Sequence, residues 1–294
     1  MPVLKIEGKE VRLSNLDKVY FPALNITKGE VIDYYIRMAP HILPHLFNRP
    51  FSMLNFPDGY GNKSFYRKQC PPEAPPWIET VAIPSSRKGE VDWCLVNNTA
   101  TLVWMINRSC IEMHTWTAKI SALDRPDIAL IDLDPNGNSG FKEALQLARA
   151  YAAILQELKL KAYVKTSGAT GIHSCIPLKP VHSFAEVREF LTKISRPVLQ
   201  AYPEIATMER TIKKRGDKVL LDVLQNAAGK TMPPPYSLRV TPTATVSTPL
   251  LWPELEDDTL LPERFNINNI FERIARVGDI TADLRDLQQV LPHL

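Results

Sequence analysis

The alternation of apolar and polar positions predicts a buried strand followed by a helix near the middle of the chain. The run I-A-L-I-D-L-D at residues 128–134 is too short for a helix and follows the turn D-R-P-D, so it indicates a strand. Beyond it, apolar residues recur at the spacing of a helix that buries one face: Phe141, Leu145, Ala148, Ala152, Leu155 and Leu158. Asp132 and Asp134 therefore lie at the C-terminal end of the strand.

The residues that follow predict two more strands, a helix and a fourth strand. Residues 161–167 and 173–178 are apolar runs joined by G-A-T-G, which favours a β-hairpin. Ser183 and Glu186 have the spacing of a capping box, and residues 218–224 form an apolar run that carries Asp222. The order β-α-β-β-α-β is typical of ferredoxin-like and RNA-recognition-type sheets, so we predict an α+β fold.

The N-terminal part of the chain predicts a further α/β region. Thr27 and Glu30 form a capping box that predicts a helix over residues 31–39, and two β-rich runs between residues 78 and 107 flank the polar segment S-S-R-K-G-E. That segment predicts the tip of a hairpin or a protruding loop. We expect one domain over residues 1–294: an N-terminal extension at 1–125, a catalytic core at 126–245, and a C-terminal tail at 246–294 packed on the core.

The amino-acid composition indicates where the protein works but does not indicate which reaction it catalyses. An apolar content of 45% over 294 residues is ordinary for a globular protein, and no apolar run approaches the length that spans a membrane. The charged N-terminus does not resemble a signal peptide, so we expect a cytoplasmic protein without a membrane partner. A net charge of +3 is too small to indicate nucleic-acid binding, although the cluster Lys213-Lys214-Arg215 could bind phosphate.

The four cysteines give no sign of a metal site or a disulfide framework. Cys70, Cys94, Cys110 and Cys175 form no C-x-x-C pair and no His/Cys cluster at zinc spacing. We expect all four to be reduced residues of the core.

The segment D-L-D-P-N-G-N-S-G-F-K-E at residues 132–143 fits the pattern of a calcium-binding loop. Three features argue against that interpretation: the preceding element is predicted to be a strand, Ser139 stands where an apolar residue is usual, and the chain contains no second such loop.

Asp132 and Asp134 instead suggest metal-dependent chemistry. Residues i and i+2 of a strand point to the same face, so both carboxylates can bind one divalent cation or a pair of them. Hard oxygen ligands suit Mg²⁺ or Mn²⁺, and Asp222 is the candidate for a third carboxylate. Alternatively, the pair only caps the next helix. The position in the chain and the following Pro135 disfavour a haloacid-dehalogenase-type phosphatase, whereas a metal-dependent nucleotide-sugar transferase remains compatible with D-x-D.

The hairpin connection S-G-A-T-G-I-H places the hydroxyl of Ser167 and the imidazole of His173 beside glycines whose N–H groups can approach phosphate oxygens. An ordinary turn with a buried histidine would give the same pattern for either residue alone. Together with D-x-D and Asp222, however, the motif completes the three-motif order of the archaeo-eukaryotic primase superfamily.

Further segments resemble the polymerase domain of prokaryotic ATP-dependent DNA ligase D. They run in the family's order from about residue 11 to residue 240: L-S-N-L-D-K-V-Y-F-P, T-K-G-E-V-I-D-Y-Y, R-P-F-S-M-L-N-F-P-D-G, K-S-F-Y-R-K, E-M-H-T-W, D-R-P-D-I-A-L-I-D-L-D-P, T-S-G-A-T-G-I-H, L-L-D-V-L-Q-N-A-A-G-K-T and P-P-Y-S-L-R. The resemblance implies an end-joining polymerase with a primase-superfamily core and DNA-binding elements in the N-terminal extension. Such enzymes fill gaps at broken DNA ends with Ku protein and an ATP-dependent DNA ligase, prefer ribonucleotides, and act near the nucleoid.

By this resemblance, Asp132, Asp134 and Asp222 are catalytic and hold two metal ions, Mn²⁺ or Mg²⁺. The positions that match nucleotide-binding residues, for ribo- or deoxynucleoside triphosphates, are His114, Ser167, His173, Arg215, Gln225 and Arg239.

The resemblance also implies residues that bind DNA. Lys18 and Lys28 match two lysines that hold the 5′-phosphate across a gap, although either could be only a solvated surface charge. Phe65 and Tyr66 match aromatic residues that stack on bases, and core packing is the alternative. The segment S-S-R-K-G-E matches a loop that pairs two DNA ends.

The chain departs from the family pattern at two positions. Thr170 and Asn55 stand where many members have Lys and Arg, which puts nucleotide affinity in question. No ligase or nuclease motif is found, so the chain is either a separate polymerase or part of a longer protein. A DNA-end bridging module without activity and a de novo primase remain alternatives, and the pair Lys18 and Lys28 favours gap filling over priming.

Overall fold

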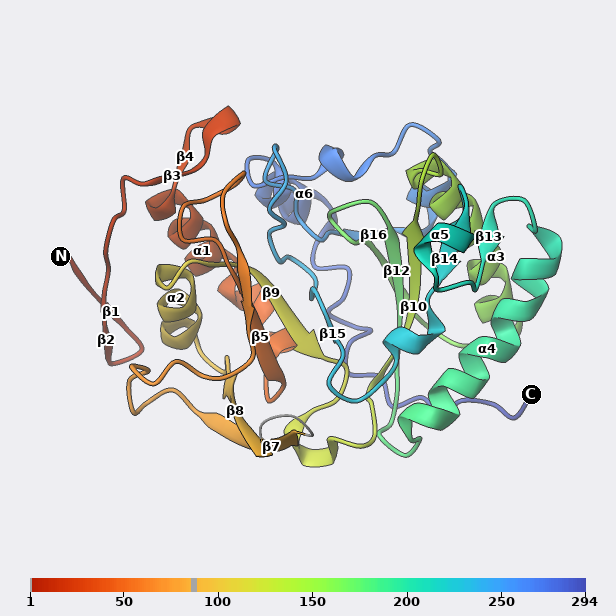
Figure 1. Ribbon diagram of the computed structural model, residues 1–294, viewed down its shortest axis with the longest axis horizontal. Coiled ribbons are helices and arrows are strands. Elements are labelled where there is room, and N and C mark those ends of the chain that lie inside the picture. The colour runs from red at the N-terminus through yellow and green to blue at the C-terminus, as the bar shows by residue number, and fades with distance from the viewer. Residues whose placement is uncertain (1, 86–88) are drawn as a thin grey trace.

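Two β-sheets form the frame of the structure, a computed structural model that describes residues 2–85 and 89–294 (Figure 1). Helices α1 and α2 lie beside the N-terminal sheet, and α3 and α4 lie beside the second sheet, on the opposite side of the molecule (Figure 1). None of the described helices is both long and apolar enough to cross a membrane.

The second sheet carries the predicted β-α-β-β-α-β core. Its strand order is β13-β14-β10-β12-β11-β16. The four central strands pair antiparallel in the order β14-β10-β12-β11, which is the order of an RNA-recognition-type sheet, so this prediction is confirmed. The elements are β10 (Ile128–Pro135), α3 (Phe141–Glu157), β11 (Tyr163–Thr166), β12 (Ile172–Pro177), α4 (Phe184–Ala201), β13 (Ala206–Thr207), α5 (Ile212–Arg215), β14 (Val219–Leu221) and β16 (Pro249–Leu250).

Strand alternation divides the side chains of this sheet between two faces. Ile131 and Leu133 belong to the same apolar core as the buried residues of α3 and α4. Asp132 and Asp134 alternate with them and therefore face away from the helices. His173 of β12 pairs with Asp132, and Lys165 of β11 pairs with His173, so both side chains lie on the same face of the sheet as the aspartates. The alternation that packs one face of the sheet against α3 and α4 therefore also gathers these polar side chains on the opposite face.

The N-terminal sheet has the order β15-β9-β5-β8-β7, with β6 paired to β5. A separate apolar core fills the space between this sheet and α1 and α2. The elements are α1 (Lys28–Leu46), β5 (Pro50–Asn55), β6 (Phe65–Arg67), β7 (Thr80–Ser85), β8 (Gly89–Leu95), α2 (Thr99–Asn107), β9 (Cys110–Trp116) and β15 (Thr231–Met232). Two small sheets precede it, formed by β1 (Val3–Ile6) with β2 (Lys9–Arg12) and by β3 (Val19–Phe21) with β4 (Ile26–Thr27).

Both capping boxes are present. Thr27 and Glu30 cap α1, and Ser183 and Glu186 cap α4, each with reciprocal hydrogen bonds between side chain and backbone. The tail contributes α6 (Ile270–Val277), and its Ile270 packs into the N-terminal core. The boundaries proposed at residues 125 and 245 stay a prediction.

Three expectations are refined or corrected. The predicted hairpin is β7–β8, whose register ends at Ser85 and Gly89; the tip residues 86–88 lie outside the described part of the chain. The end of the 78–107 interval forms helix α2 rather than a strand, because Asn98 caps it through a hydrogen bond to the backbone N–H of Thr101. Asp222 lies one residue beyond β14 rather than within a strand.

The cysteine prediction is half wrong. All four cysteines are buried, as expected, but Cys70 and Cys94 form a disulfide with their Cα atoms 5.2 Å apart. Only Cys110 and Cys175 are free. The pairing joins the segment after β6 to β8, two segments that approach each other through sheet topology rather than through a sequence motif.

Candidate active site

The three predicted catalytic aspartates lie close together where the C-terminal half of β10 pairs with β14. Asp132 and Asp134 lie on one face of β10, and Leu133 between them pairs with Leu221 of β14. The backbone N–H of Asp222 donates to the carbonyl oxygen of Asp132 at 3.0 Å, so the pairing extends one residue past the strand.

A buried asparagine fixes the segment that carries Asp222. The side chain of Asn226 accepts a hydrogen bond from Leu130 N–H and donates one to Leu130 C=O, both at 2.8 Å. These paired bonds imitate a strand pairing and hold the turn Val223–Gln225 against β10.

The charges of this cluster suit a divalent cation. Burial raises the pKa of Asp134, and the neighbouring Asp132 adds to the effect while Arg215 opposes it. Burial and Asp132 likewise raise the pKa of Asp222. Half-buried carboxylates that repel one another are stabilised by a cation, and hard carboxylate oxygens are the ligands that Mg²⁺ and Mn²⁺ prefer. Within residues 2–85 and 89–294, no three His, Cys, Asp or Glu side chains are already arranged as a metal site, so the fit rests on charge and donor type.

The loop after β10 does not have the setting of a calcium loop, since a strand precedes it, as predicted. Its asparagines are engaged within the protein: Asn138 donates to the Asp217 carboxylate from both its backbone and its side chain, and Asn136 N–H donates to Ser139 Oγ at 2.8 Å.

The connection between β11 and β12 folds tightly onto the aspartate strand. Ser167 Oγ accepts hydrogen bonds from the backbone N–H groups of Ala169 and Gly171, at 3.2 and 3.0 Å. A Cβ at Gly171 would lie 2.1 Å from the carbonyl oxygen of Leu133, so only glycine allows this approach. Gly168 has φ +77°, the left-handed conformation that favours glycine. The second motif is therefore held directly beside the first.

His173 links the two motifs. It pairs with Asp132 across the β10–β12 ladder, and its Nε2 lies 3.3 Å from Asp132 Oδ1. Its Nδ1 accepts a hydrogen bond from the fully buried Lys165 Nζ at 2.9 Å, and Lys165 also donates to Ser247 Oγ at 2.6 Å. Burial and the charge of Lys165 lower the pKa of His173 to about 4, and burial lowers the pKa of Lys165 to about 7.

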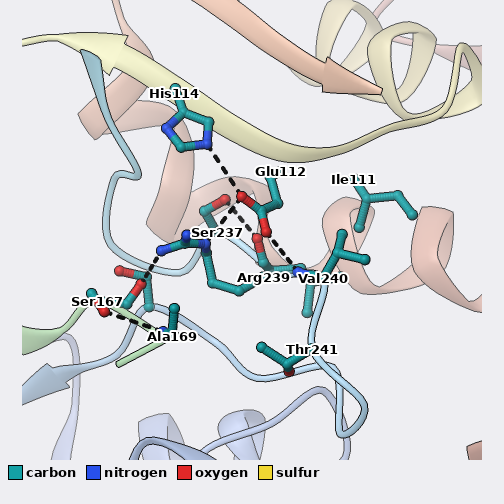
Figure 2. A network of polar contacts seen from close by, with 12 residues as sticks. Ile111, Glu112, His114, Ser167, Ala169, Ser237, Arg239, Val240 and Thr241 are labelled. Carbon is teal, nitrogen blue, oxygen red and sulfur yellow. Dashed lines mark hydrogen bonds and ion pairs between the residues drawn. The ribbon is translucent and has the colours of Figure 1, made fainter. Parts of the chain in front are cut away.

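A second network joins His114 and Arg239 through Glu112 (Figure 2). Glu112 Oε2 lies 3.3 Å from His114 Nε2 and 3.1 Å from Arg239 Nε, and its Oε1 accepts from Val240 N–H at 2.7 Å. Arg239 also donates to the carbonyl oxygen of Ser167 at 2.6 Å, which connects the N-terminal sheet to the second motif. Burial would raise the pKa of Glu112, but these donors and the charge of Arg239 hold it at about 2.

These groups surround one cavity of about 450 Å³ between the two sheets, a size suited to a small-molecule ligand. The predicted residues in its lining are Tyr66, His114, Asp132, Asp134, Ser167, His173, Gln225 and Arg239. Two further predicted residues lie next to lining residues without lining the cavity themselves. Asp222 is hydrogen-bonded to the backbone of Asp132, and Arg215 Nη1 lies 3.6 Å from Asp134 Oδ2. Arg215 ends α5 and is the member of the Lys213-Lys214-Arg215 cluster that lies next to the aspartates.

Lys18 and Lys28 lie next to each other, outside this lining. The backbone N–H of Lys28 donates to Lys18 C=O at 2.8 Å, and Lys18 Nζ lies 2.5 Å from Asp58 Oδ1. Lys28 is buried and forms no ion pair with a carboxylate among the described residues; its Nζ donates to the carbonyl oxygen of Ser14 at 2.6 Å. Burial and the charges of Lys18 and Arg108 lower its pKa to about 8. A buried cation of this kind favours an anionic ligand.

Phe65 and Tyr66 do not pack in the core. Their exposed fractions are 44% and 60%, which is unusual for neighbouring large aromatic side chains. The Tyr66 ring lies edge-on to His114, with ring centroids 5.5 Å apart, at the rim of the cavity.

The two departures from the family pattern differ in position. Thr170 lines the cavity, whereas Asn55 is buried in β5 and is not part of the lining. Lys68 and Lys230 also line the cavity and provide positive charge that the sequence analysis did not assign. Glu112, Lys165 and Asn226 were missed as well. The sequence did contain signals for two of them. Lys165 is a charged residue inside an apolar strand, and Glu112 lies on the same strand face as His114 in E-M-H.

Comparison with known proteins agrees with this arrangement. Residues 27–281 match the family described as LigD, primase-polymerase domain. The chain is 32% identical over 278 residues to the multifunctional non-homologous end joining protein LigD of Mycolicibacterium smegmatis, covering 94% of this chain and 36% of that protein. It is 34% identical over 270 residues to the bifunctional LigD of Bacillus subtilis, covering 92% and 43%. The chain thus spans less than half the length of these relatives.

A solved structure extends the match to three dimensions. The polymerase domain from Mycobacterium tuberculosis ligase D in complex with DNA superposes with a TM-score of 0.88 at 29% identity, covering 95% of this chain and 99% of that one. The family match and the shared fold confirm the resemblance, and the chain belongs to the LigD primase-polymerase domain family.

Proposed function

We propose that this chain is a template-directed polymerase that fills gaps at DNA double-strand breaks during end joining, with a preference for ribonucleotides. The observation that carries the proposal is the placement of Asp132 and Asp134 beside a cavity whose other walls hold His114, His173 and Arg239. Nucleotidyl transfer requires carboxylates that bind metal cations next to side chains that donate hydrogen bonds to phosphate oxygens.

In this proposal Asp132, Asp134 and Asp222 hold Mg²⁺ or Mn²⁺. Bound metal ions would lower the pKa of the primer 3′-hydroxyl and neutralise charge on the α-phosphate and the departing pyrophosphate. The protein's own contribution is orientation. The β10–β14 pairing and the backbone hydrogen bond that follows it hold Asp222 beside Asp132, and the glycines of the 167–171 loop let backbone N–H groups come close to phosphate oxygens.

The donors around the cavity are assigned to the nucleotide. Arg239 and His114 come from the Glu112 network, and His173 comes from the second motif. Arg215 is close enough to Asp134 to approach the same triphosphate, and Gln225 lines the cavity beside them. Charge-assisted bonds to phosphate are the strong ones, so these residues supply nucleotide affinity.

Contacts with DNA are assigned to the N-terminal part. The buried ammonium group of Lys28, beside Lys18, suits the 5′-phosphate of the downstream strand. The exposed rings of Phe65 and Tyr66 suit stacking on template bases. The β7–β8 hairpin suits pairing of two ends, as the resemblance implies.

The names of the relatives support the biological setting. Both LigD proteins are non-homologous end joining proteins, and the solved neighbour binds DNA. We therefore propose that this chain works with Ku protein and an ATP-dependent DNA ligase on chromosomal breaks in the cytoplasm, near the nucleoid.

The test is primer extension on a templated duplex with each nucleotide offered singly, as ribo- and as deoxynucleoside triphosphate, with Mg²⁺ or Mn²⁺. Addition of only the nucleotide complementary to the template, faster with ribonucleotides, supports the proposal. A folded protein that binds the duplex and adds no nucleotide with either metal would refute it and favour a bridging module.

A further inference from the structure

Glu112 is a buried carboxylate that serves two neighbours at once. Its exposed fraction is 6%, and its oxygens meet His114 Nε2, Arg239 Nε and the backbone N–H of Val240 (Figure 2). His114 lies on β9, and Arg239 lies in the segment after β15, where it also donates to the carbonyl oxygen of Ser167. Removing a carboxylate from such a position leaves an arginine without its countercharge.

The same contact fixes the tautomer of His114. An ionised carboxylate only accepts hydrogen bonds, so His114 Nε2 carries the proton that points at Glu112. The other nitrogen, Nδ1, is turned away from Glu112 (Figure 2). In a neutral imidazole that nitrogen presents a lone pair, which repels a phosphate oxygen. His114 can donate to a triphosphate through Nδ1 only as an imidazolium.

We propose that Glu112 is a positioning residue that makes His114 take up a proton together with the incoming triphosphate. The proposal rests on the proposed function, since it assigns a protonation step to the nucleotide site. Glu112 keeps Nε2–H engaged, so the added proton goes to Nδ1 on the side away from Glu112, and it comes from solvent. The imidazolium then lies between two anions, the Glu112 carboxylate and a phosphate.

The groups around His114 agree with a neutral ring before nucleotide binding. Burial lowers the pKa of His114, Arg239 and the buried Lys165 lower it further, and the hydrogen bond to Glu112 opposes them. Tyr66 packs edge-on against the ring from β6. The other titratable side chains in the cavity lining are Lys68, Lys230, Asp132, Asp134 and His173. A triphosphate adds several negative charges beside His114 and favours the protonated ring.

Nucleotide affinity alone does not test the proposal. Glu112→Gln removes a negative charge near a polyanion, which favours binding, but it also releases Arg239, which disfavours binding. Proton uptake separates this role from a merely structural one, because a residue that only supports the fold does not change how many protons accompany the ligand.

The experiment is calorimetric titration of ATP into the whole chain at saturating Mg²⁺ and pH 7.5, in buffers of different ionisation enthalpy. We expect the wild type to take up about one proton more per ATP than His114→Asn, in which any uptake by the neighbouring Lys165 remains, and Glu112→Gln to show less than about half of that excess. The matched control is Glu186→Gln, a distant capping-box residue where Gln also caps, and it should keep the full uptake.

A second readout uses the unaltered protein and so does not depend on a variant's folding. Nitrogen-15 spectra of labelled histidines should place His114 as the Nε2–H tautomer alone and as the doubly protonated ring with Mg²⁺ and ATP. Binding without proton uptake, or uptake in His114→Asn that equals that of the wild type, would overturn the proposal and leave the polymerase function standing. Failure of ATP to bind the wild type with metal present would overturn the proposed function, and this inference with it.

Discussion

His173 and Asp132 face each other across two neighbouring antiparallel strands, with His173 Nε2 3.3 Å from Asp132 Oδ1. The register of β10 and β12 produces this contact, so the side chain assigned to the nucleotide and the side chain assigned to the metal are held by one pair of strands. The phosphate and the metal ions would thus meet in a fixed relative position.

The carboxylates are predicted to be required for catalysis and dispensable for DNA binding. Asp132→Asn should lower nucleotide addition by at least about a thousandfold, because no neutral side chain can stabilise the cations at the reacting phosphate. Gel-shift affinity for the duplex should remain, since phosphate contacts elsewhere supply it. The exposed Asp286→Asn serves as the control. Residual activity of Asp132→Asn close to the wild type, at saturating metal, would contradict the assigned role.

The low pKa of Lys28 predicts a pH dependence of the response to a 5′-phosphate. Its pKa of about 8 means that the free protein loses the charge as pH rises from 7 to 9. The ratio of extension with and without the phosphate should therefore fall, by about tenfold per unit above pH 8 if binding requires the protonated lysine. Lys28→Arg should keep the ratio level because arginine stays charged over this range. A wild-type ratio that does not change with pH would argue against a phosphate contact at Lys28.

Replacing Thr170 by lysine is predicted to increase the affinity for the nucleotide. Thr170 lines the cavity where many family members have lysine, so Thr170→Lys should lower the KM for the nucleotide by about fivefold and change kcat less. Thr170→Met is the control, because it adds length without charge. Equal effects of the two substitutions would show that charge at this position is not what matters.

Burial of Lys165 predicts how stability depends on pH. Its pKa is about 7 in the folded protein and 10.5 in the unfolded chain, so the unfolded state binds more protons between these values. This group therefore lowers stability at pH 7 and below, and the penalty disappears as pH rises toward 10.5. Relative to Lys165→Met, the wild-type Tm should rise by roughly 3 °C or more from pH 7 to 9. Lys161 is exposed, so the Tm difference between the wild type and Lys161→Met should not change in this way between pH 7 and 9. An equal change in that difference would contradict the burial argument.

Much of the fold could be predicted from local sequence because its signals are local. The capping boxes at Thr27 and Ser183 and the strand before Asp134 depend on residues within a few positions of one another, and all were found where expected. Strand alternation alone was enough to place Asp132 and Asp134 on one face of β10.

The remaining features depend on contacts between distant segments. Glu112 meets Val240 across 128 positions, and Lys165 meets Ser247 across 82, so nothing near either residue indicates its partner. The Cys70–Cys94 pair likewise forms because β8 passes the segment after β6. Sequence patterns identified the residues on each face, but the packing of one sheet against the other decided which faces meet.

The most direct test of the account is extension of a primer across a short gap, with and without a 5′-phosphate on the downstream strand. We predict templated addition that increases with the phosphate in the wild type, and a loss of that increase, but not of basal addition, in the Lys18→Ala Lys28→Ala double variant. Addition that is indifferent to the phosphate, or an increase that survives in the double variant, would contradict the assignment of these lysines to the DNA end.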